Sequence, residues 1–315
     1  MKGRYSKASY IKKPGFYDPP STSIQDIICT RTNDTSTDLA YPSSRYKSVR
    51  NLSAETSAST IYEGYDTLEN RKVIIKKICK QEYWRQELEV LRKLKSNTSG
   101  RLLRFLDFYE SQRNSFIITE FYPGFDLFEH IDLNVPYTEK HGLIIIREMA
   151  LCIKECHDKV IIHLDIKCEN FMVNTDYLIS TDSKPGKIVL IDFGHAETIK
   201  PGESIEKLRR GYNYGTSYFL CPEGYFEKIS SSKSDIWSLG ICLSLLLTGD
   251  YPYVGDKKEY YKNSVIGNFT FTTPTSEEST EIIKKCLDLN PFSRPNINQL
   301  LEMLEKRLEH LRCVF

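Results

Sequence analysis

The chain lacks a charge excess, a paired-cysteine motif and a long apolar run. Its 43 Lys and Arg residues nearly balance 42 Asp and Glu residues, for a formal charge of +1. This balance argues against a protein whose whole surface binds nucleic acid. The nine cysteines are odd in number and contain no Cys-x-x-Cys pair, which indicates reduced thiols rather than a disulfide framework.

No segment has the length or composition of a membrane anchor. The longest apolar stretch, Ile236 to Leu247, is too short to span a bilayer, and residues 1–10 contain no apolar signal core. We therefore expect an intracellular protein, in the cytoplasm or the nucleus, that binds neither a membrane nor nucleic acid.

The first fifty residues differ in composition from the rest. They hold 13 Ser and Thr residues, and nine Lys and Arg residues against four Asp residues. Because they show almost no periodic apolar pattern, we expect a disordered basic arm over residues 1–50. Such an arm either docks partners or is only a flexible, solvating terminus, and its composition leaves both readings open.

Strand-like segments precede helical ones along the remaining chain. Period-two patterns predict strands at 60–62, 72–78, 104–109 and 115–121, and a helical pattern predicts a helix over 81–95. After Pro123 the predicted helices are 139–157, 233–248, 277–287 and 296–312, with short strands at 171–173 and 188–191. The pattern predicts an α+β protein with a small sheet-rich lobe (51–121) before a larger helical lobe (122–312), and a ligand site where the lobes meet.

Two short motifs carry most of the chemical information. Residues 163–170 read HLDIKCEN, and Asp192-Phe193-Gly194 follows 22 residues after Asn170. Phosphoryl transfer to a hydroxyl needs a carboxylate base, a cation near the phosphate and oxygen ligands for Mg²⁺. In this order, each beside an apolar strand-like run, the motifs resemble the catalytic loop and the metal loop of eukaryotic protein kinases.

The resemblance implies a role for each polar residue of these loops. Asp165 would be the catalytic base and Lys167 the cation at the transferred phosphate. Asn170 and Asp192 would be the Mg²⁺ ligands. The implied fold is the two-lobed kinase fold, with an antiparallel sheet and one helix in the first lobe.

Lys76 and Glu87 are the candidates for the ion pair of the small lobe. Lys76 ends the strand motif Val73-Ile74-Ile75-Lys76, whose Lys holds the α- and β-phosphates in kinases. Glu87 lies one helical turn before Leu91, which directs it inward. Their separation of 11 residues is shorter than is usual in kinases, so a surface position for Glu87 is the alternative.

The segment that joins the lobes supplies the expected nucleotide site. By resemblance, the backbone of Glu120 and Tyr122 would bind the adenine edge, Thr119 would lie behind the purine and Asp126 would meet the ribose. Asp126 is equally well placed to cap the helix that follows it, and the two readings are compatible. The resemblance adds three apolar residues to the nucleotide site: Ile61, Ile74 and Met172.

Residues 215–223 and 290–295 resemble two further kinase motifs. The first stretch holds the peptide substrate, and its Glu223 would form a buried structural pair with Arg294. Residues 235–240 resemble the start of the buried central helix of the family. Lys167 and Thr216 favour Ser/Thr over Tyr substrates, because in the family they bracket the base that acts on a short hydroxyl side chain.

Three features depart from the family pattern. Ala54, Thr56 and Ser59 replace the three glycines of the phosphate loop, which would make that loop stiffer or differently shaped. Ile74 replaces the Ala over the adenine, which puts ATP affinity in doubt. Leu164 replaces the Arg that receives the activation-loop phosphate, so we expect activity largely independent of phosphorylation in that loop.

The sequence therefore predicts an ATP- and Mg²⁺-dependent protein kinase that acts on Ser/Thr hydroxyls of protein substrates, in intracellular signalling or cell-cycle control. Its motifs share features with Wee-type kinases and with calmodulin-dependent or Pim-like kinases, and the subfamily stays open. The alternatives are a pseudokinase or weakly active scaffold with impaired nucleotide binding, and a small-molecule phosphotransferase of the same fold.

Overall fold

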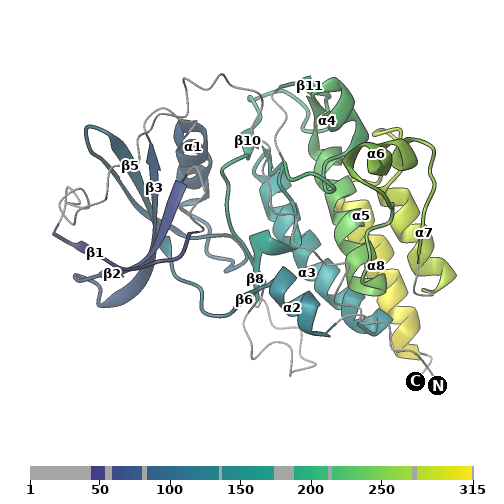
Figure 1. Ribbon diagram of the computed structural model, residues 1–315, viewed down its shortest axis with the longest axis horizontal. Coiled ribbons are helices and arrows are strands. Elements are labelled where there is room, and N and C mark those ends of the chain that lie inside the picture. The colour runs from purple at the N-terminus through teal and green to yellow at the C-terminus, as the bar shows by residue number, and fades with distance from the viewer. Residues whose placement is uncertain are drawn as a thin grey trace.

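The computed structural model describes residues 44–53, 59–79, 84–134, 137–173, 188–211, 215–271 and 275–313. These residues form two lobes, one built on a sheet and one built on helices (Figure 1). The predicted α+β class and two-lobed arrangement are confirmed.

The small lobe is a five-stranded antiparallel sheet with the strand order β1-β2-β3-β5-β4. Its strands are β1 (Tyr46–Asn51), β2 (Ser59–Asp66), β3 (Arg71–Cys79), β4 (Phe105–Glu110) and β5 (Asn114–Glu120). Helix α1 (Trp84–Leu94) follows β3 and buries Leu88, Leu91 and Leu94. One outer cluster of buried side chains packs β1 onto the sheet: Tyr46, Tyr62, Val73, Ile75, Phe116 and Ile118.

Strand β1 corrects the predicted start of the folded part. The boundary at residue 50 is wrong, because Tyr46–Asn51 pairs with β2 along the edge of the sheet. The sequence hid this strand because an edge strand exposes most of its side chains, and Tyr46 alone is fully buried in it. Residues 1–43 of the predicted arm lie outside the described residues.

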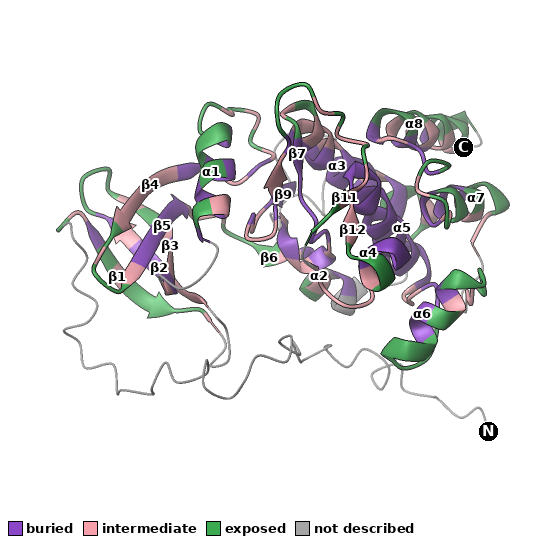
Figure 2. Cartoon of the chain, turned by 90° about the horizontal axis from the view of Figure 1, so that it is seen from above, coloured by how far each residue is buried: buried purple, intermediate pink, exposed green. Residues whose placement is uncertain are grey.

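The large lobe packs its helices around one central helix, α5 (Ser232–Thr248). All of its residues are buried, as the view from above shows (Figure 2). Ser231 caps α5 by accepting a hydrogen bond from the Lys233 amide, and Gly249 ends the helix with φ of 78°. The other helices are α2 (Leu127–Asn134), α3 (Glu139–Asp158), α4 (Pro222–Glu227), α6 (Lys257–Val265), α7 (Glu277–Cys286) and α8 (Ile297–Cys313).

Short strand pairs carry the loops at the junction of the lobes. The β6 strand (Phe125–Asp126), β8 (Phe171–Val173) and β9 (Ile188–Leu190) form one small sheet. The β7 strand (Ile161–Ile162) pairs with β10 (Glu197–Thr198), and β11 (Arg209–Arg210) pairs with β12 (Ile229–Ser230). These pairs hold the catalytic loop, the Asp-Phe-Gly loop and the segment after it.

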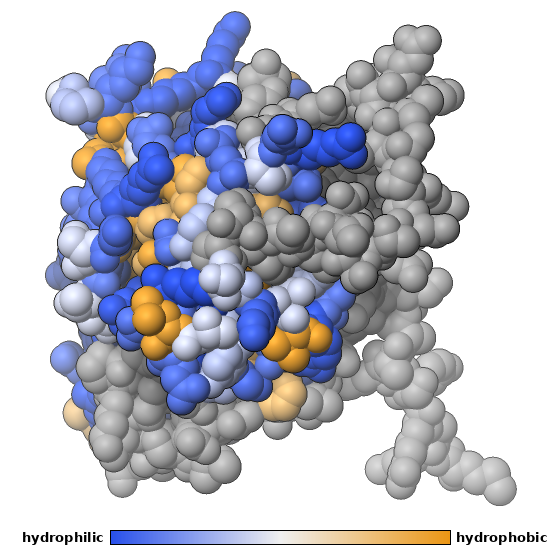
Figure 3. All heavy atoms as spheres, turned by 90° about the vertical axis from the view of Figure 1, so that its left-hand side faces the viewer, coloured by the Kyte–Doolittle hydropathy of each residue, from blue (hydrophilic) through white to orange (hydrophobic). Residues whose placement is uncertain are grey.

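The outer face of the sheet lobe is mainly polar. Figure 3 shows hydrophilic groups over most of the coloured surface, with a few separate hydrophobic patches. The exposed large apolar residues of this lobe are Val49, Leu52 and Leu68, and isolated residues of this kind are ordinary on a protein surface. In the ranges that the structure describes, no helix has the length and apolar character to cross a membrane.

Candidate active site

Lys76 on β3 contacts one carboxylate from each lobe. Its Nζ lies 2.9 and 3.0 Å from the two carboxylate oxygens of Glu87 on α1, and 3.0 Å from Oδ1 of Asp192 in the Asp-Phe-Gly loop. Alternation along β3 turns Lys76 toward the lobe junction, and the helical period places Glu87 on the buried face of α1. The short separation of 11 residues therefore still permits the contact.

The charges of Lys76 and Asp192 stabilise each other, whereas burial raises the pKa of Glu87 despite its contact with Lys76. Burial opposes the charge on Lys76, but the carboxylates of Asp192 and Glu87 outweigh it and raise the pKa of Lys76. The Lys76 ammonium in turn holds the pKa of Asp192 well below its usual range, with help from the Gly194 amide. Asp192 is therefore ionised at neutral pH and keeps one carboxylate oxygen, Oδ2, outside these contacts.

A second polar group lies in the large lobe and consists of Asp165, Lys167 and Thr216. Oδ1 of Asp165 accepts hydrogen bonds from the Thr216 amide and hydroxyl at 2.8 and 2.9 Å, while Nζ of Lys167 lies 3.0 Å from Oδ2. Lys167 also donates to the Thr216 hydroxyl at 2.7 Å. Burial opposes the charge on Asp165, but the Lys167 ammonium and the nearby His195 together outweigh it and lower the pKa of Asp165. Residues 163–170 and the stretch 215–223 thus meet at one carboxylate.

Asn170 and Asp192 offer oxygens suited to a hard cation. The Asn170 amide donates through Nδ2 to the carbonyl and the carboxylate of Asp165 at 2.7 and 3.1 Å, which leaves Oδ1 as its acceptor. The Ile191 amide donates to the Asn170 carbonyl at 2.8 Å and so brings residue 192 next to residue 170. These oxygens fit Mg²⁺, which prefers few protein ligands together with phosphate oxygens and water. Within the described ranges, no group of three or more His, Cys, Asp or Glu side chains is arranged to hold a metal.

Asp235 on α5 holds the backbone of the loop that contains Asp165. Its carboxylate is fully buried and accepts hydrogen bonds from the backbone amides of His163 and Leu164 at 3.0 and 2.8 Å. Leu164 has φ of 65°, a left-handed conformation that is unfavourable for a non-glycine residue. Asp235 therefore holds the strained turn just before Asp165. In the sequence, residue 235 is recognisable only as part of a helix start, and this contact was not predicted.

The expected nucleotide residues lie on the strands that border the lobe junction. Ile74 faces Thr119 across β3 and β5, and Ile61 faces Lys76 across β2 and β3. Met172 pairs with Asp126 across β6 and β8. The apolar members Ile61, Ile74 and Met172 are half-buried.

The joining segment is ordered by its own contacts. The Glu120 amide donates to the Arg104 carbonyl at 3.0 Å, and the Tyr122 hydroxyl donates to the Glu120 carboxylate at 3.3 Å. Asp126 accepts a hydrogen bond from the Glu129 amide at 2.8 Å. Asp126 therefore caps the N-terminus of α2, which is one of the two roles that the sequence suggested for it.

Leu164 lies in an apolar contact with the segment that follows the Asp-Phe-Gly loop. It packs with Ile162 and Ile199 in a buried cluster, with Ile205 against it. The segment is also held by the Glu203–Arg209 and Glu206–Lys233 ion pairs, at 3.4 and 3.6 Å. An apolar contact thus occupies the position where the family carries its phosphate-binding Arg. Three residues stand where the family has the glycines of its phosphate loop. Ala54 and Thr56 lie outside the described residues, and Ser59 begins β2.

Glu223 and Arg294 form the expected buried pair. Two parallel contacts of 2.6 and 2.8 Å join the carboxylate to the guanidinium, and the Arg294 side chain is fully buried. The pair fixes α4, whose first two residues end the stretch 215–223, to the loop before α8.

Comparisons with known proteins agree with this geometry. Residues 55–304 match the model of the protein kinase domain. The chain is 30% identical to "Probable serine/threonine-protein kinase MARK-C" of Dictyostelium discoideum over 68% of its length and 26% of that protein. It is 28% identical to "Calcium-dependent protein kinase 24" of Arabidopsis thaliana (69% of this chain, 36% of the relative) and 24% identical to "Sperm motility kinase 3A" of Mus musculus (77% and 46%).

The chain spans less than half the length of each of these relatives. The domain match nevertheless covers most of the chain and every residue of the site described above. On this match and this geometry, the chain belongs to the protein kinase family.

Proposed function

We propose that the chain transfers the γ-phosphoryl group of ATP to Ser or Thr hydroxyls of protein substrates. The observation that carries the proposal is the linked set Glu87–Lys76–Asp192, with Asn170 and Asp165 in contact beside it. Phosphoryl transfer needs positioned charges more than covalent chemistry, and this set supplies both signs of charge in one place.

Each residue has a definite task in this reaction. Lys76, fixed by Glu87, would hold the α- and β-phosphates. Asp165 would orient the substrate hydroxyl and accept its proton, while Lys167 would neutralise charge on the transferred group. Asn170 and Asp192 would hold Mg²⁺, which supplies electrostatic stabilisation of the phosphate oxygens.

The nucleotide and protein substrates would meet at this set from different sides. Ile61, Ile74 and Met172 would contact the purine, with Thr119 behind it and the backbone of Glu120 and Tyr122 at its edge. Asp126 would serve the ribose while capping α2. The contact between Thr216 and Asp165 favours a short Ser or Thr hydroxyl at the base. The basic Ser- and Thr-rich segment that the sequence predicts over residues 1–50 would dock protein partners.

The direct test is transfer of labelled γ-phosphate from ATP·Mg²⁺ to a generic protein substrate. We expect transfer by the wild type and a loss of at least about a hundredfold in the Asp165→Ala variant. Asp158→Ala, an exposed acidic residue at the end of α3, is the control and should keep full activity. Equal signals from the wild type and Asp165→Ala would contradict the proposal.

A pseudokinase or weakly active scaffold is the second candidate. The replaced glycines and Ile74 at the expected purine site favour it, because both alter the surroundings of the nucleotide. Thermal unfolding with millimolar ATP·Mg²⁺ separates the two candidates, since a ligand that binds only the native state must raise its stability. No stabilisation by the nucleotide would favour the scaffold.

A further inference from the structure

Two hydrogen bonds tie strand β10 and the residues before it to helix α1. Nε2 of Gln86 donates to the Ala196 carbonyl at 3.0 Å, and the Thr198 hydroxyl donates to Oε1 of Glu89 at 3.0 Å. Glu87, which holds Lys76, lies on α1 between these two contacts. The position of the Lys76–Glu87 pair therefore depends in part on contacts of the segment after the Asp-Phe-Gly loop.

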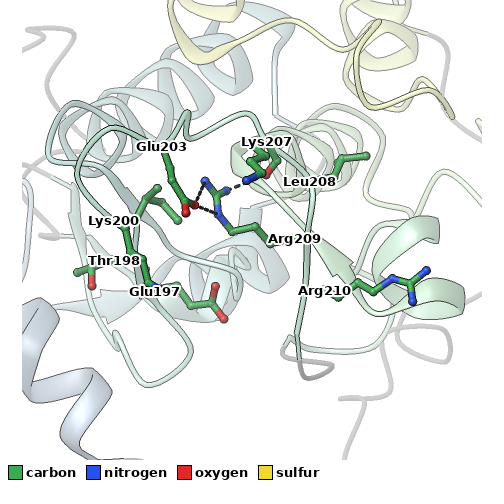
Figure 4. Close-up of a pocket in the computed structure, with 9 residues that line it drawn as sticks. Glu197, Thr198, Lys200, Glu203, Lys207, Leu208, Arg209 and Arg210 are labelled. Carbon is green, nitrogen blue, oxygen red and sulfur yellow. Dashed lines mark hydrogen bonds and ion pairs between the residues drawn. The ribbon is translucent and has the colours of Figure 1, made fainter.

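The Thr198 contact lies at the surface. Glu89 is exposed, and Thr198 is only half-buried. Strand alternation sends Glu197 and Thr198 to opposite sides of β10, and Figure 4 shows Glu197 on the side of Arg209 and Thr198 turned away from it. The hydroxyl is therefore accessible, and none of the roles assigned above uses it.

The charges on the two sides of Thr198 differ in sign. On the side of α1 its partner is the Glu89 carboxylate. On the other side, Thr198 borders a cavity of about 400 Å³ whose charged lining is mainly basic: Lys200, Lys207, Arg209 and Arg210, against Glu197 and Glu203. Arg209 pairs with Glu203 across this cavity (Figure 4), while exposed Lys200 and Lys207 have no ion pair within the described ranges.

We propose that Thr198 is a phosphorylation site whose modification disconnects α1 from β10 and lowers the kinase activity; the second half of this proposal rests on the proposed function. In the modification, Oγ1 of Thr198 forms a bond to the γ-phosphorus of a nucleoside triphosphate. The bond from that phosphorus to the β,γ-bridging oxygen breaks, the nucleoside diphosphate leaves, and the hydroxyl proton passes to water.

Two physical effects act in the same direction after the transfer. The phosphate removes the hydroxyl donor and places nearly two negative charges beside the Glu89 carboxylate, so an attraction becomes a repulsion. Lys200, two residues farther along the segment, attracts the phosphate toward the cavity side. Phosphorylation at Thr198 therefore acts in the opposite sense to the activating phosphate that the family receives on an Arg. The independence expected from Leu164 concerns only that activating phosphate, and an inhibitory phosphate on Thr198 is an exception to it.

The first experiment asks whether Thr198 is modified. The chain is isolated from its source cells, or incubated with ATP·Mg²⁺, and its peptides are examined by mass spectrometry. We expect phosphate on Thr198 in at least one of the two preparations. Its absence from both would overturn the assignment of the site.

The second experiment reverses the charges of the contact. We expect Thr198→Glu to lower kcat/KM about tenfold, the factor that repulsion between two partly exposed charges about 4 Å apart produces. Adding Glu89→Lys should restore activity to within about threefold of the wild type. Ser204→Glu places the same charge farther along the segment, near Arg209, and is the matched control, with activity unchanged.

Amide hydrogen exchange over residues 84–94 tests the Thr198–Glu89 contact independently of catalysis. We expect faster exchange of the α1 amides in Thr198→Glu and recovery of protection in the double variant. If the chain transfers no phosphate but its α1 amides exchange faster in Thr198→Glu and are protected again in the double variant, the proposed function is contradicted. The inference that the Thr198–Glu89 contact holds α1 then still stands. Equal protection and activity in Thr198→Glu and the wild type, or a loss that Glu89→Lys does not repair, would overturn the inference.

Discussion

Replacement of Glu223 by Gln should destabilise the protein by about 3–5 kcal/mol, because it leaves a buried guanidinium without its counter-charge. The Arg294 side chain is fully buried, and two contacts of 2.6 and 2.8 Å join it to the carboxylate. It cannot turn toward water, since it also donates to the Asp288 carbonyl at 2.7 Å and lies 4.9 Å over the Trp237 ring. We therefore expect a loss in the upper part of this range.

Urea unfolding followed by circular dichroism measures this loss. Asp158→Asn is the control, because its pair with Lys154 is 34% and 55% exposed and should contribute about 0.5 kcal/mol or less. Arg294→Met combined with Glu223→Gln should cost at least about 2 kcal/mol less than the sum of the single variants. A loss under about 1 kcal/mol in Glu223→Gln, or additive losses in the double variant, would refute the reasoning.

Four further predictions concern the site. Ile74→Ala should lower the dissociation constant for ATP·Mg²⁺ about fivefold or more by relieving crowding at the expected purine site, and calorimetry that finds weaker binding would contradict this. Phosphatase treatment should not lower wild-type activity, because the apolar contacts of Leu164 hold the segment without phosphate, whereas Leu164→Ala should cost about 2–3 kcal/mol of stability. Since Lys76 lowers the pKa of Asp192 below its ordinary 3.8, the stability that Asp192 adds is present above that pH and is lost as the pH falls through its lowered pKa. The difference in unfolding free energy between the wild type and Asp192→Asn should thus be constant from about pH 7 to about pH 5 and shrink below about pH 4; a steady decline between pH 7 and pH 5 would contradict the charge pairing.

The sequence predicted the parts of the site that depend on short-range order. Asp165, Lys167 and Asn170 lie in one loop, so their spacing limits how far apart they can be. Helical periodicity alone directed Glu87 inward, and alternation directed Lys76 toward the same region. The four helices predicted after Pro123 lie within one residue of the observed ends of α3, α5, α7 and α8, whereas the helix predicted over 81–95 is observed over 84–94. Helices α3, α7 and α8 each bury one apolar face, and α5 is buried throughout.

Contacts between distant segments could not be predicted from one sequence. Asp235 and the Leu164 amide are 71 residues apart, and Glu89 and Thr198 are 109 residues apart. Neither pair has a local pattern, since a carboxylate that binds a backbone amide or a hydroxyl looks like any other acidic residue. Short helix α4 was also missed, because six residues are too few to show a period.

The hydrogen bonds from Asp235 have a consequence for how the site is prepared. They join the turn at Leu164 to a helix that lies entirely inside the large lobe. The entropy needed to order the catalytic loop is thus spent when the chain folds rather than when substrates arrive. The loop is preorganised, and an Asp235→Asn chain should remain folded yet require its ligands to restore the turn, so its losses should appear in turnover before they appear in thermal stability.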